Sequence, residues 1–129
     1  MDETDLDFVD IVNKILPCEK HLPGMRYCGP GTRLDLRLND DWTPKPGSEP
    51  IDRVDEAAMR HDIEYSKHDD LRNRNKADKE MINDLLSIER PTCRERCERF
   101  FVLPIMILKR LIGSLILWII DLFAAINIR

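Results

Sequence analysis

The fold of this chain is decided by residues 52–65, which read DRVDEAAMRHDIEY. Mostly apolar and aromatic side chains recur in this stretch at helical spacing: Val54, Ala57, Ala58, His61 and Tyr65. Pro50 precedes it and Asp52 is a suitable N-cap, so the pattern predicts a helix over residues 51–68. His61 and Asp62 stand near its centre, and because adjacent helical residues point about 100° apart, the two side chains face different surroundings.

A second helix is predicted over residues 71–90, which have apolar positions at helical spacing and are followed by Pro91. If the two helices form an antiparallel hairpin, its tip lies midway between His61 and Asp78. Each residue is then about 12 Å from the tip at 1.5 Å per residue, so both lie at the same level. Asp78 can therefore accept a hydrogen bond from one ring nitrogen of His61, which leaves the other nitrogen able to take a proton from water.

A long irregular loop is predicted over residues 17–50, which hold six of the eight prolines and all but one of the glycines. Loops of this length in a small domain are usually functional or disordered. Within it, residues 27–31 read YCGPG, and a Gly-Pro-Gly turn can direct several backbone carbonyls inward. Calcium ions take six to eight oxygen ligands, many of them backbone carbonyls, so the loop and the Asp62 carboxylate are suited to a calcium site.

Taken together, these motifs resemble the phospholipase A2 superfamily. The resemblance is closest to the compact domain in the N-terminal region of parvoviral minor capsid proteins, and similar domains occur in virus-like mobile elements. It covers roughly residues 22–88 and rests on the following positions: Tyr27, Cys28, Gly29, Pro30, Gly31, Asp55, Ala57, Ala58, His61, Asp62, Tyr65, Ala77 and Asp78. It implies a mainly α fold with an antiparallel catalytic helix pair and a glycine-rich calcium loop; a hydrophobic C-terminal helix, predicted from the apolar residues beyond this region, is expected in addition.

The resemblance also implies roles for individual residues. His61 is expected to be the general base that deprotonates a water attacking the sn-2 ester of a glycerophospholipid. Asp78 is expected to orient His61, and the Tyr65 hydroxyl to steady Asp78. A bound calcium ion would stabilise the oxyanion of the tetrahedral intermediate. Its implied ligands are the carbonyls of Tyr27, Gly29 and Gly31 and the carboxylate of Asp62.

The chain departs from secreted phospholipases in several ways. Cysteines beside and within their catalytic helices are replaced here, by Ala57, Ala58, Glu64 and Ala77. The second tyrosine that often supports the orienting acid is missing, because the chain has only two tyrosines. The interval from His61 to Asp78 leaves no room for a β-wing, so modest activity would be unsurprising.

Composition and cysteine usage indicate the setting. The net charge of −4 argues against nucleic acid as a partner. The acidic N-terminus lacks the features of a secretory signal, and four cysteines are too few and too scattered to require a disulfide scaffold, so a reduced, intracellular protein is expected. Cys18 and Cys28 could form a bridge, whereas Cys93 and Cys97 are interpreted as packed or free thiols rather than a metal site or a disulfide.

Both ends of the chain are expected to be helical. Residues 5–16 have the pattern of a short amphipathic helix that ends at Pro17. Residues 100–128 are strongly apolar, although Lys109 and Arg110 divide them and leave residues 111–128 as the best candidate span. The polar or small positions fall on one stripe: Lys109, Arg110, Gly113, Ser114, Asp121 and Asn127.

Four arrangements fit this C-terminal pattern. The helix could lie in a bilayer interface, span a bilayer in an oligomer that hides the stripe, pack against a protein such as a capsid, or cover the helix hairpin as a core helix. Membrane contact is favoured because the apolar arc is wider than a small domain needs. If the helix spans, the basic residues before it would keep the enzyme domain on the cytosolic side.

The sequence thus predicts three parts: an N-terminal amphipathic helix (1–17), a phospholipase A2-like catalytic domain (18–90), and a basic hinge with a hydrophobic C-terminal helix (91–129). The expected function is calcium-dependent phospholipid hydrolysis at a membrane, for membrane breach by a virus or virus-like element. The expected location is a virion or a host intracellular membrane, with capsid or other virion proteins as further partners. The alternatives are a catalytically weak protein that anchors to or disrupts membranes, and a structural virion component that retains the lipase fold.

Overall fold

The computed structural model of the chain describes residues 24–29 and 32–127. These residues are mainly helical and contain no β-strand, and their only β-bridge joins Leu38 and Pro44. The predicted mainly α class and the long apolar C-terminal helix are confirmed. The helix expected over residues 5–16 and the proposed ligand Gly31 lie outside the described residues. The elements are α2 (Leu34–Arg37), α3 (Arg53–Lys67), α4 (Leu71–Leu86) and α5 (Cys93–Asn127).

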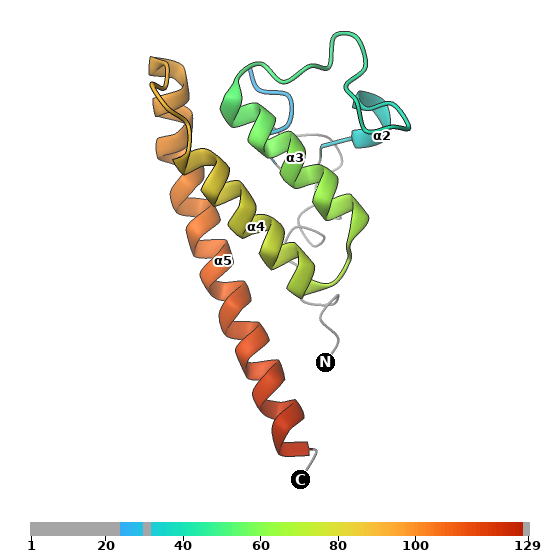
Figure 1. Cartoon of the computed structure of the whole chain (residues 1–129), viewed down its shortest axis with the longest axis vertical. Helices are drawn as coiled ribbons and strands as arrows, with labels where there is room; N and C mark the ends of the chain where they lie inside the picture. The colour runs from blue at the N-terminus through green and yellow to red at the C-terminus, as the bar shows by residue number, and fades with distance from the viewer. Residues whose placement is uncertain (1–23, 30–31, 128–129) are drawn as a thin grey trace.

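Helices α3 and α4 form an antiparallel hairpin joined by residues 68–70 (Figure 1). The Asp52 carboxylate caps α3 by accepting a hydrogen bond from the Asp55 amide at 2.8 Å, as the sequence predicts. Asp70 caps α4 in the same way, through the Asn73 amide at 2.9 Å. Such caps satisfy amide groups that have no partner within the first helical turn. Helix α4 ends at Leu86, four residues before the predicted end.

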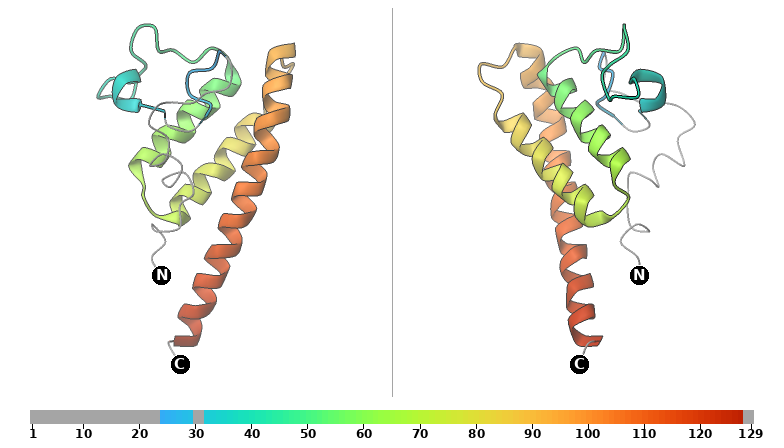
Figure 2. Two further views of the ribbon diagram at one scale, coloured as in Figure 1. Left: turned by 180° about the vertical axis from the view of Figure 1, so that it is seen from behind. Right: turned by 45° about the vertical axis from the view of Figure 1, so that its right-hand side comes forward.

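Helix α5 lies alongside α4 and continues beyond the hairpin (Figures 1 and 2). Its first half belongs to the core of the domain, because Val102 and Met106 are buried there with side chains from α3, α4 and the loop before them. The core cluster consists of Met25, Tyr27, Cys28, Leu38, Val54, Ala57, Ala58, Met81, Ile82, Leu85, Val102 and Met106. One hydrophobic core therefore joins the loop, the hairpin and α5.

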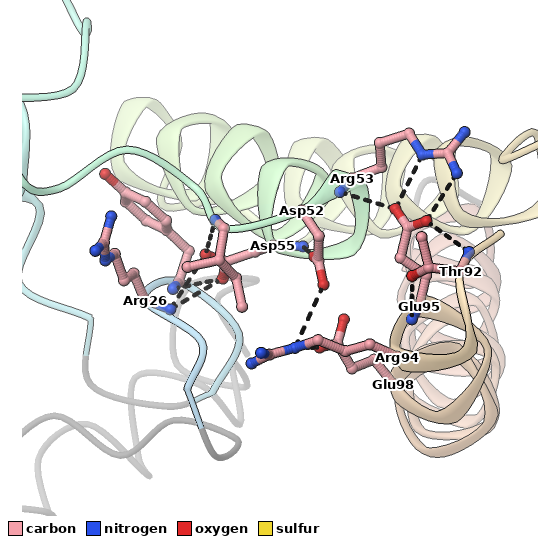
Figure 3. Close-up of polar contacts among 10 residues, drawn as sticks. Arg26, Asp52, Arg53, Asp55, Thr92, Arg94, Glu95 and Glu98 are labelled. Atoms are coloured by element: carbon pink, nitrogen blue, oxygen red, sulfur yellow. Dashed lines mark hydrogen bonds and ion pairs between the residues drawn. The ribbon is translucent and has the colours of Figure 1, made fainter.

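A polar junction fixes the start of α5 to the start of α3 (Figure 3). Thr92 and Glu95 form a reciprocal capping box, with the Glu95 amide 3.1 Å from Thr92 Oγ1 and the Thr92 amide 3.0 Å from Glu95 Oε1. Glu95 also accepts hydrogen bonds from Arg53 Nε at 2.9 Å and Nη2 at 2.7 Å. These bonds from Arg53 outweigh the effect of burial and lower the pKa of Glu95 to about 2.

The polar stripe of α5 faces α4. Asn75 Nδ2 donates to the Arg110 carbonyl at 3.0 Å, and Arg72 pairs with Asp121 at 2.9 Å. A Cβ atom at Gly113 would lie 2.7 Å from Asn75 Nδ2, so glycine permits the close approach of the two helices. Helix α4 therefore packs against the part of the stripe around Arg110 and Gly113, whereas Ser114, Asp121 and Asn127 are exposed.

The opposite face of α5 is apolar and exposed, as the sequence predicts. By length and composition α5 could cross a membrane, and only 22% of its most apolar 18-residue segment is buried in the structure. The large exposed apolar side chains of α5 are Phe100, Phe101, Ile105, Ile107, Leu108, Leu111, Ile112, Leu115, Trp118, Leu122, Phe123 and Ile126. A helix that only covered the hairpin would not need this surface.

Candidate active site

The hairpin brings His61 and Tyr65 of α3 against Asp78 of α4. His61 Nε2 lies 2.6 Å from Asp78 Oδ1, and the Tyr65 hydroxyl donates to the same oxygen at 2.7 Å. The His61 and Tyr65 rings pack with their centroids 4.3 Å apart. The side chains of His61 and Asp78 are only 10% and 4% exposed. The hydrogen bond predicted from the equal distance of both residues to the hairpin tip is therefore confirmed.

The protonation of the pair follows from its surroundings. Burial favours the neutral acid, but the His61 hydrogen bond, the Lys109 charge and the Tyr65 hydroxyl together lower the pKa of Asp78. Burial opposes a charged imidazole, yet the neighbouring carboxylates of Asp62 and Asp78 raise the pKa of His61 overall. Because an ionised carboxylate only accepts, Nε2 carries a proton, so Nδ1 has the free lone pair in neutral His61. Nδ1 lies 3.7 Å from Asp62 Oδ1.

Lys109 of α5 is a member of this cluster that the sequence did not reveal. Its Nζ donates to the Tyr65 hydroxyl oxygen and, at 3.2 Å, to Asp78 Oδ1. The same ammonium lies 4.0 Å from the centroid of the Tyr65 ring. In the sequence Lys109 is only an interruption of an apolar run, and the one available signal was its place on the same stripe as Gly113.

Asp55 is a second residue whose role the sequence did not reveal, although it belongs to the motif. Its fully buried carboxylate accepts hydrogen bonds from three backbone amides: Arg26 at 3.2 Å, Tyr27 at 2.8 Å and Ile51 at 3.1 Å (Figure 3). The loop that contains Tyr27 and Gly29 is thereby attached to the first turn of α3.

The carbonyls of Tyr27 and Gly29 face a common point. Both lie within hydrogen-bond distance of Thr32 Oγ1, at 3.3 Å and 3.4 Å. Gly29 has a φ of 147°, a conformation that favours glycine. The Cys28 thiol between them is buried, and burial together with the nearby Asp55 and Asp62 carboxylates raises its pKa to about 12.

These groups fit a calcium ion by chemistry, since all are oxygen ligands. Residues 24–29 and 32–127 contain no cluster of three or more His, Cys, Asp or Glu side chains placed to hold a metal. The predicted site uses backbone carbonyls and one carboxylate, so it does not depend on such a cluster. Cys28, Cys93 and Cys97 are free thiols, as expected for the last two; Cys18 lies outside the described residues.

An open pocket of about 460 Å³ reaches the cluster along the groove between α3 and α4. Of the cluster, His61 forms part of its wall. The lining residues are Arg60, His61, Ile63, Glu64, Ala77, Glu80, Met81 and Asp84.

The chain matches the family of the phospholipase A2-like domain over residues 18–93. Because this match covers more than half of the chain, the chain belongs to that family, and membership indicates lipid hydrolysis as the general activity. Neither the curated proteins nor the solved structures contain a match to the chain. The matched region ends where α5 begins, so Lys109 lies outside it.

Proposed function

We propose that the protein is a calcium-dependent phospholipase A2 that hydrolyses the sn-2 ester of glycerophospholipids. The observation that carries the proposal is the 2.6 Å hydrogen bond between His61 and Asp78 in a member of this family. It holds the imidazole with Nε2 protonated and Nδ1 able to accept a proton. A base of this kind makes a nucleophile out of water without a serine or cysteine nucleophile.

In this mechanism, His61 Nδ1 takes a proton from a water molecule as the water attacks the ester carbonyl. Asp78 holds the ring in the reactive orientation and stabilises the imidazolium that forms, and Tyr65 fixes Asp78 through its hydroxyl. His61 then returns the proton to the leaving alcohol. A calcium ion held by Asp62 and the carbonyls of Tyr27, Gly29 and Gly31 would supply positive charge for the oxyanion.

Two observations support calcium as the metal. The Tyr27 and Gly29 carbonyls converge on one point, at which Thr32 Oγ1 lies. The charge of the Asp62 carboxylate helps to raise the pKa of the Cys28 thiol in the same loop. Carbonyl and carboxylate oxygens suit a hard cation, and the free cysteine thiol is too buried and too weakly acidic to compete as a ligand.

We propose that the exposed face of α5 binds phospholipid bilayers and that α5 lies in the membrane interface. Its twelve large exposed apolar residues form a surface that a lipid phase would cover. Spanning is the less favourable arrangement, because Arg72 and Asn75 of α4 lie against Asp121 and Arg110 of α5. Inserting α5 would break these contacts or carry α4 into hydrocarbon. The resemblance to viral and mobile-element domains supports membrane breach as the biological role.

Fatty-acid release from phosphatidylcholine vesicles tests the proposed activity. The native chain should release fatty acid with calcium, and a chelator should abolish the release. His61→Gln should be inactive, whereas His68→Gln, which changes the partly exposed histidine at the C-cap of α3, should be as active as the native chain. Release that survives the chelator or the His61 substitution would exclude this mechanism.

The second candidate is a catalytically weak protein that disrupts membranes through α5. The exposed apolar face favours it, because that face would act without His61. Leakage of a dye from the same vesicles separates the two functions. If His61→Gln causes leakage as fast as the native chain does, disruption by α5 replaces hydrolysis as the proposed function.

A further inference from the structure

We propose that Lys109 is a positioning residue of the active site, delivered to Tyr65 and Asp78 by the C-terminal helix. This inference rests on the proposed phospholipase activity and extends it beyond the region that matches the family. It would make α5 a part of the active site as well as the membrane-binding element.

The hydrogen bonds around Asp78 have a defined direction. The Tyr65 hydroxyl gives its only proton to Asp78 Oδ1, so the hydroxyl oxygen can only accept from Lys109 Nζ. Lys109 thereby fixes the rotation of the Tyr65 hydroxyl toward Asp78. Its second contact, at 3.2 Å from Asp78 Oδ1, restrains the carboxylate directly.

Asp78 Oδ1 therefore receives three donors: His61 Nε2, the Tyr65 hydroxyl and Lys109 Nζ. The orientation of the imidazole depends on this one oxygen. A carboxylate held by a single neighbour could rotate and take the ring with it. With two donors from α3 and one from α5, its position is fixed before substrate binds, which is the condition for an ordered catalytic group.

The surroundings of Lys109 explain why its charge is tolerated. The side chain is 20% exposed, and its ammonium is paired with the Asp78 carboxylate and placed against the face of the Tyr65 ring. An ammonium partly removed from water is stabilised by such partners. A lysine that served only as the basic flank of a membrane helix would extend to water or phosphate groups instead.

The docking of α5 sets the position of Lys109. Gly113, one helical turn further on, contacts Asn75, and the Arg110 carbonyl accepts from the same side chain at 3.0 Å. These contacts fix the translation and rotation of α5 beside α4. They do so at Asn75, which precedes Asp78 by three residues on α4. Shortening the chain before α5 would therefore damage the active site along with membrane binding, so point substitutions in the full chain are the appropriate test.

The test compares Lys109→Met, Lys109→Arg and the control Arg110→Met, all in the full chain. Arg110→Met removes a positive charge from the adjacent position of the same helix. The substrate is phosphatidylcholine in mixed micelles with saturating calcium, which reduces the dependence on membrane charge. Lys109→Met should lower kcat about 10- to 100-fold, with KM changed by no more than about twofold. Lys109→Arg should recover most of the rate, and Arg110→Met should retain it.

A second measurement does not depend on activity. The chain has two tyrosines, so ¹³C labelling of the tyrosine ζ-carbon yields two NMR signals, one from Tyr65 and one from Tyr27. Lys109→Met should shift the Tyr65 signal and leave Tyr27 unchanged, and Arg110→Met should shift neither. If Lys109→Met fails to fold, Lys109→Gln, which keeps a donor without the charge, takes its place.

The outcomes are distinguishable. An unchanged kcat in Lys109→Met, or an unshifted Tyr65 signal, would overturn the inference. It would also be overturned if Lys109→Arg is as slow as Lys109→Met while both melt at lower temperature, because this is the pattern of a purely structural residue. A native chain that is inactive with calcium but shows the Tyr65 shift would refute the proposed function and leave the contact itself established.

Discussion

Replacing Asp55 by asparagine tests how the loop is attached to the hairpin. The Asp55 carboxylate is fully buried and accepts hydrogen bonds from the amides of Arg26, Tyr27 and Ile51. Asparagine has nearly the same shape but only one acceptor oxygen, and its NH₂ group would face at least one backbone donor. Unlike a truncation, the substitution leaves no cavity, so its effect reports on the hydrogen bonds.

The magnitude follows from the number of donors left without a partner. An unsatisfied buried amide costs about 1–3 kcal/mol, and hydrogen bonds to a charged acceptor are the stronger ones. Losing one or two of the three bonds should lower the free energy of unfolding by about 3 kcal/mol. For a chain of this length, the corresponding decrease in Tm is about 10–15 °C.

Circular dichroism during heating or urea unfolding measures this change. The matched control is Asp40→Asn, because Asp40 is exposed in the loop before α3. Calcium affinity should also decrease in Asp55→Asn, since Tyr27 and Gly29 would lose their attachment to α3. A decrease in Tm no larger than that of the control would show that the three bonds do not hold the loop, and the reasoning would fail.

Three further predictions concern the metal, the pH dependence and the membrane. Asp62→Asn should weaken calcium binding about tenfold or more in calorimetry, while Asp69→Asn on the exposed hairpin tip should not; equal affinities would exclude Asp62 as a ligand. Burial and the neighbouring Asp52 raise the pKa of Glu98 from 4.5 to about 7, so folding favours its protonated form and stability falls as pH rises from about 4.5 through about 7. Glu98→Gln, which keeps an acceptor for Arg94, should therefore be more stable than the native chain at about pH 8 and no more stable at about pH 4 in urea denaturation. A stability difference between variant and native chain that is the same at both pH values would contradict the raised pKa of Glu98. Leu115→Glu and Trp118→Glu on the exposed face of α5 should reduce sedimentation with vesicles about tenfold or more while Tm stays within about 2 °C; undiminished sedimentation would place the membrane contact elsewhere.

Local patterns sufficed for the helix hairpin. The spacing of apolar residues and the Asp52 cap predicted α3, and the start of α4 was predicted at its observed residue. The contact between His61 and Asp78 followed because a tight antiparallel hairpin leaves little freedom: two residues equally far from the tip must lie at the same level. The end of α4 was predicted four residues too late, since helix ends are decided by local competition that periodicity does not describe.

Contacts between distant segments were not predictable in the same way. The polar stripe on α5 was recognised from the sequence, but four arrangements of the helix remained possible, because a stripe carries no information on what lies against it. The structure shows that α4 packs against the part of the stripe around Arg110 and Gly113, and that this packing brings Lys109 to Tyr65. Asp55 was likewise visible in the motif without a role, because its three amide partners belong to segments with no regular pattern.

The sequence by itself therefore determined the two helices and the register of His61 against Asp78, whereas the calcium ligands that the resemblance implies stay a prediction. The helices and this register depend on interactions between near neighbours or on the rigid geometry of one tight turn. Only the tertiary structure decided that Asp55 holds the loop, that α5 docks through its polar stripe, and that Lys109 completes the cluster around Asp78. Apart from the bond between Asp55 and Ile51, such contacts join residues 28 or more positions apart, and they form only when a shared core brings their backbones together.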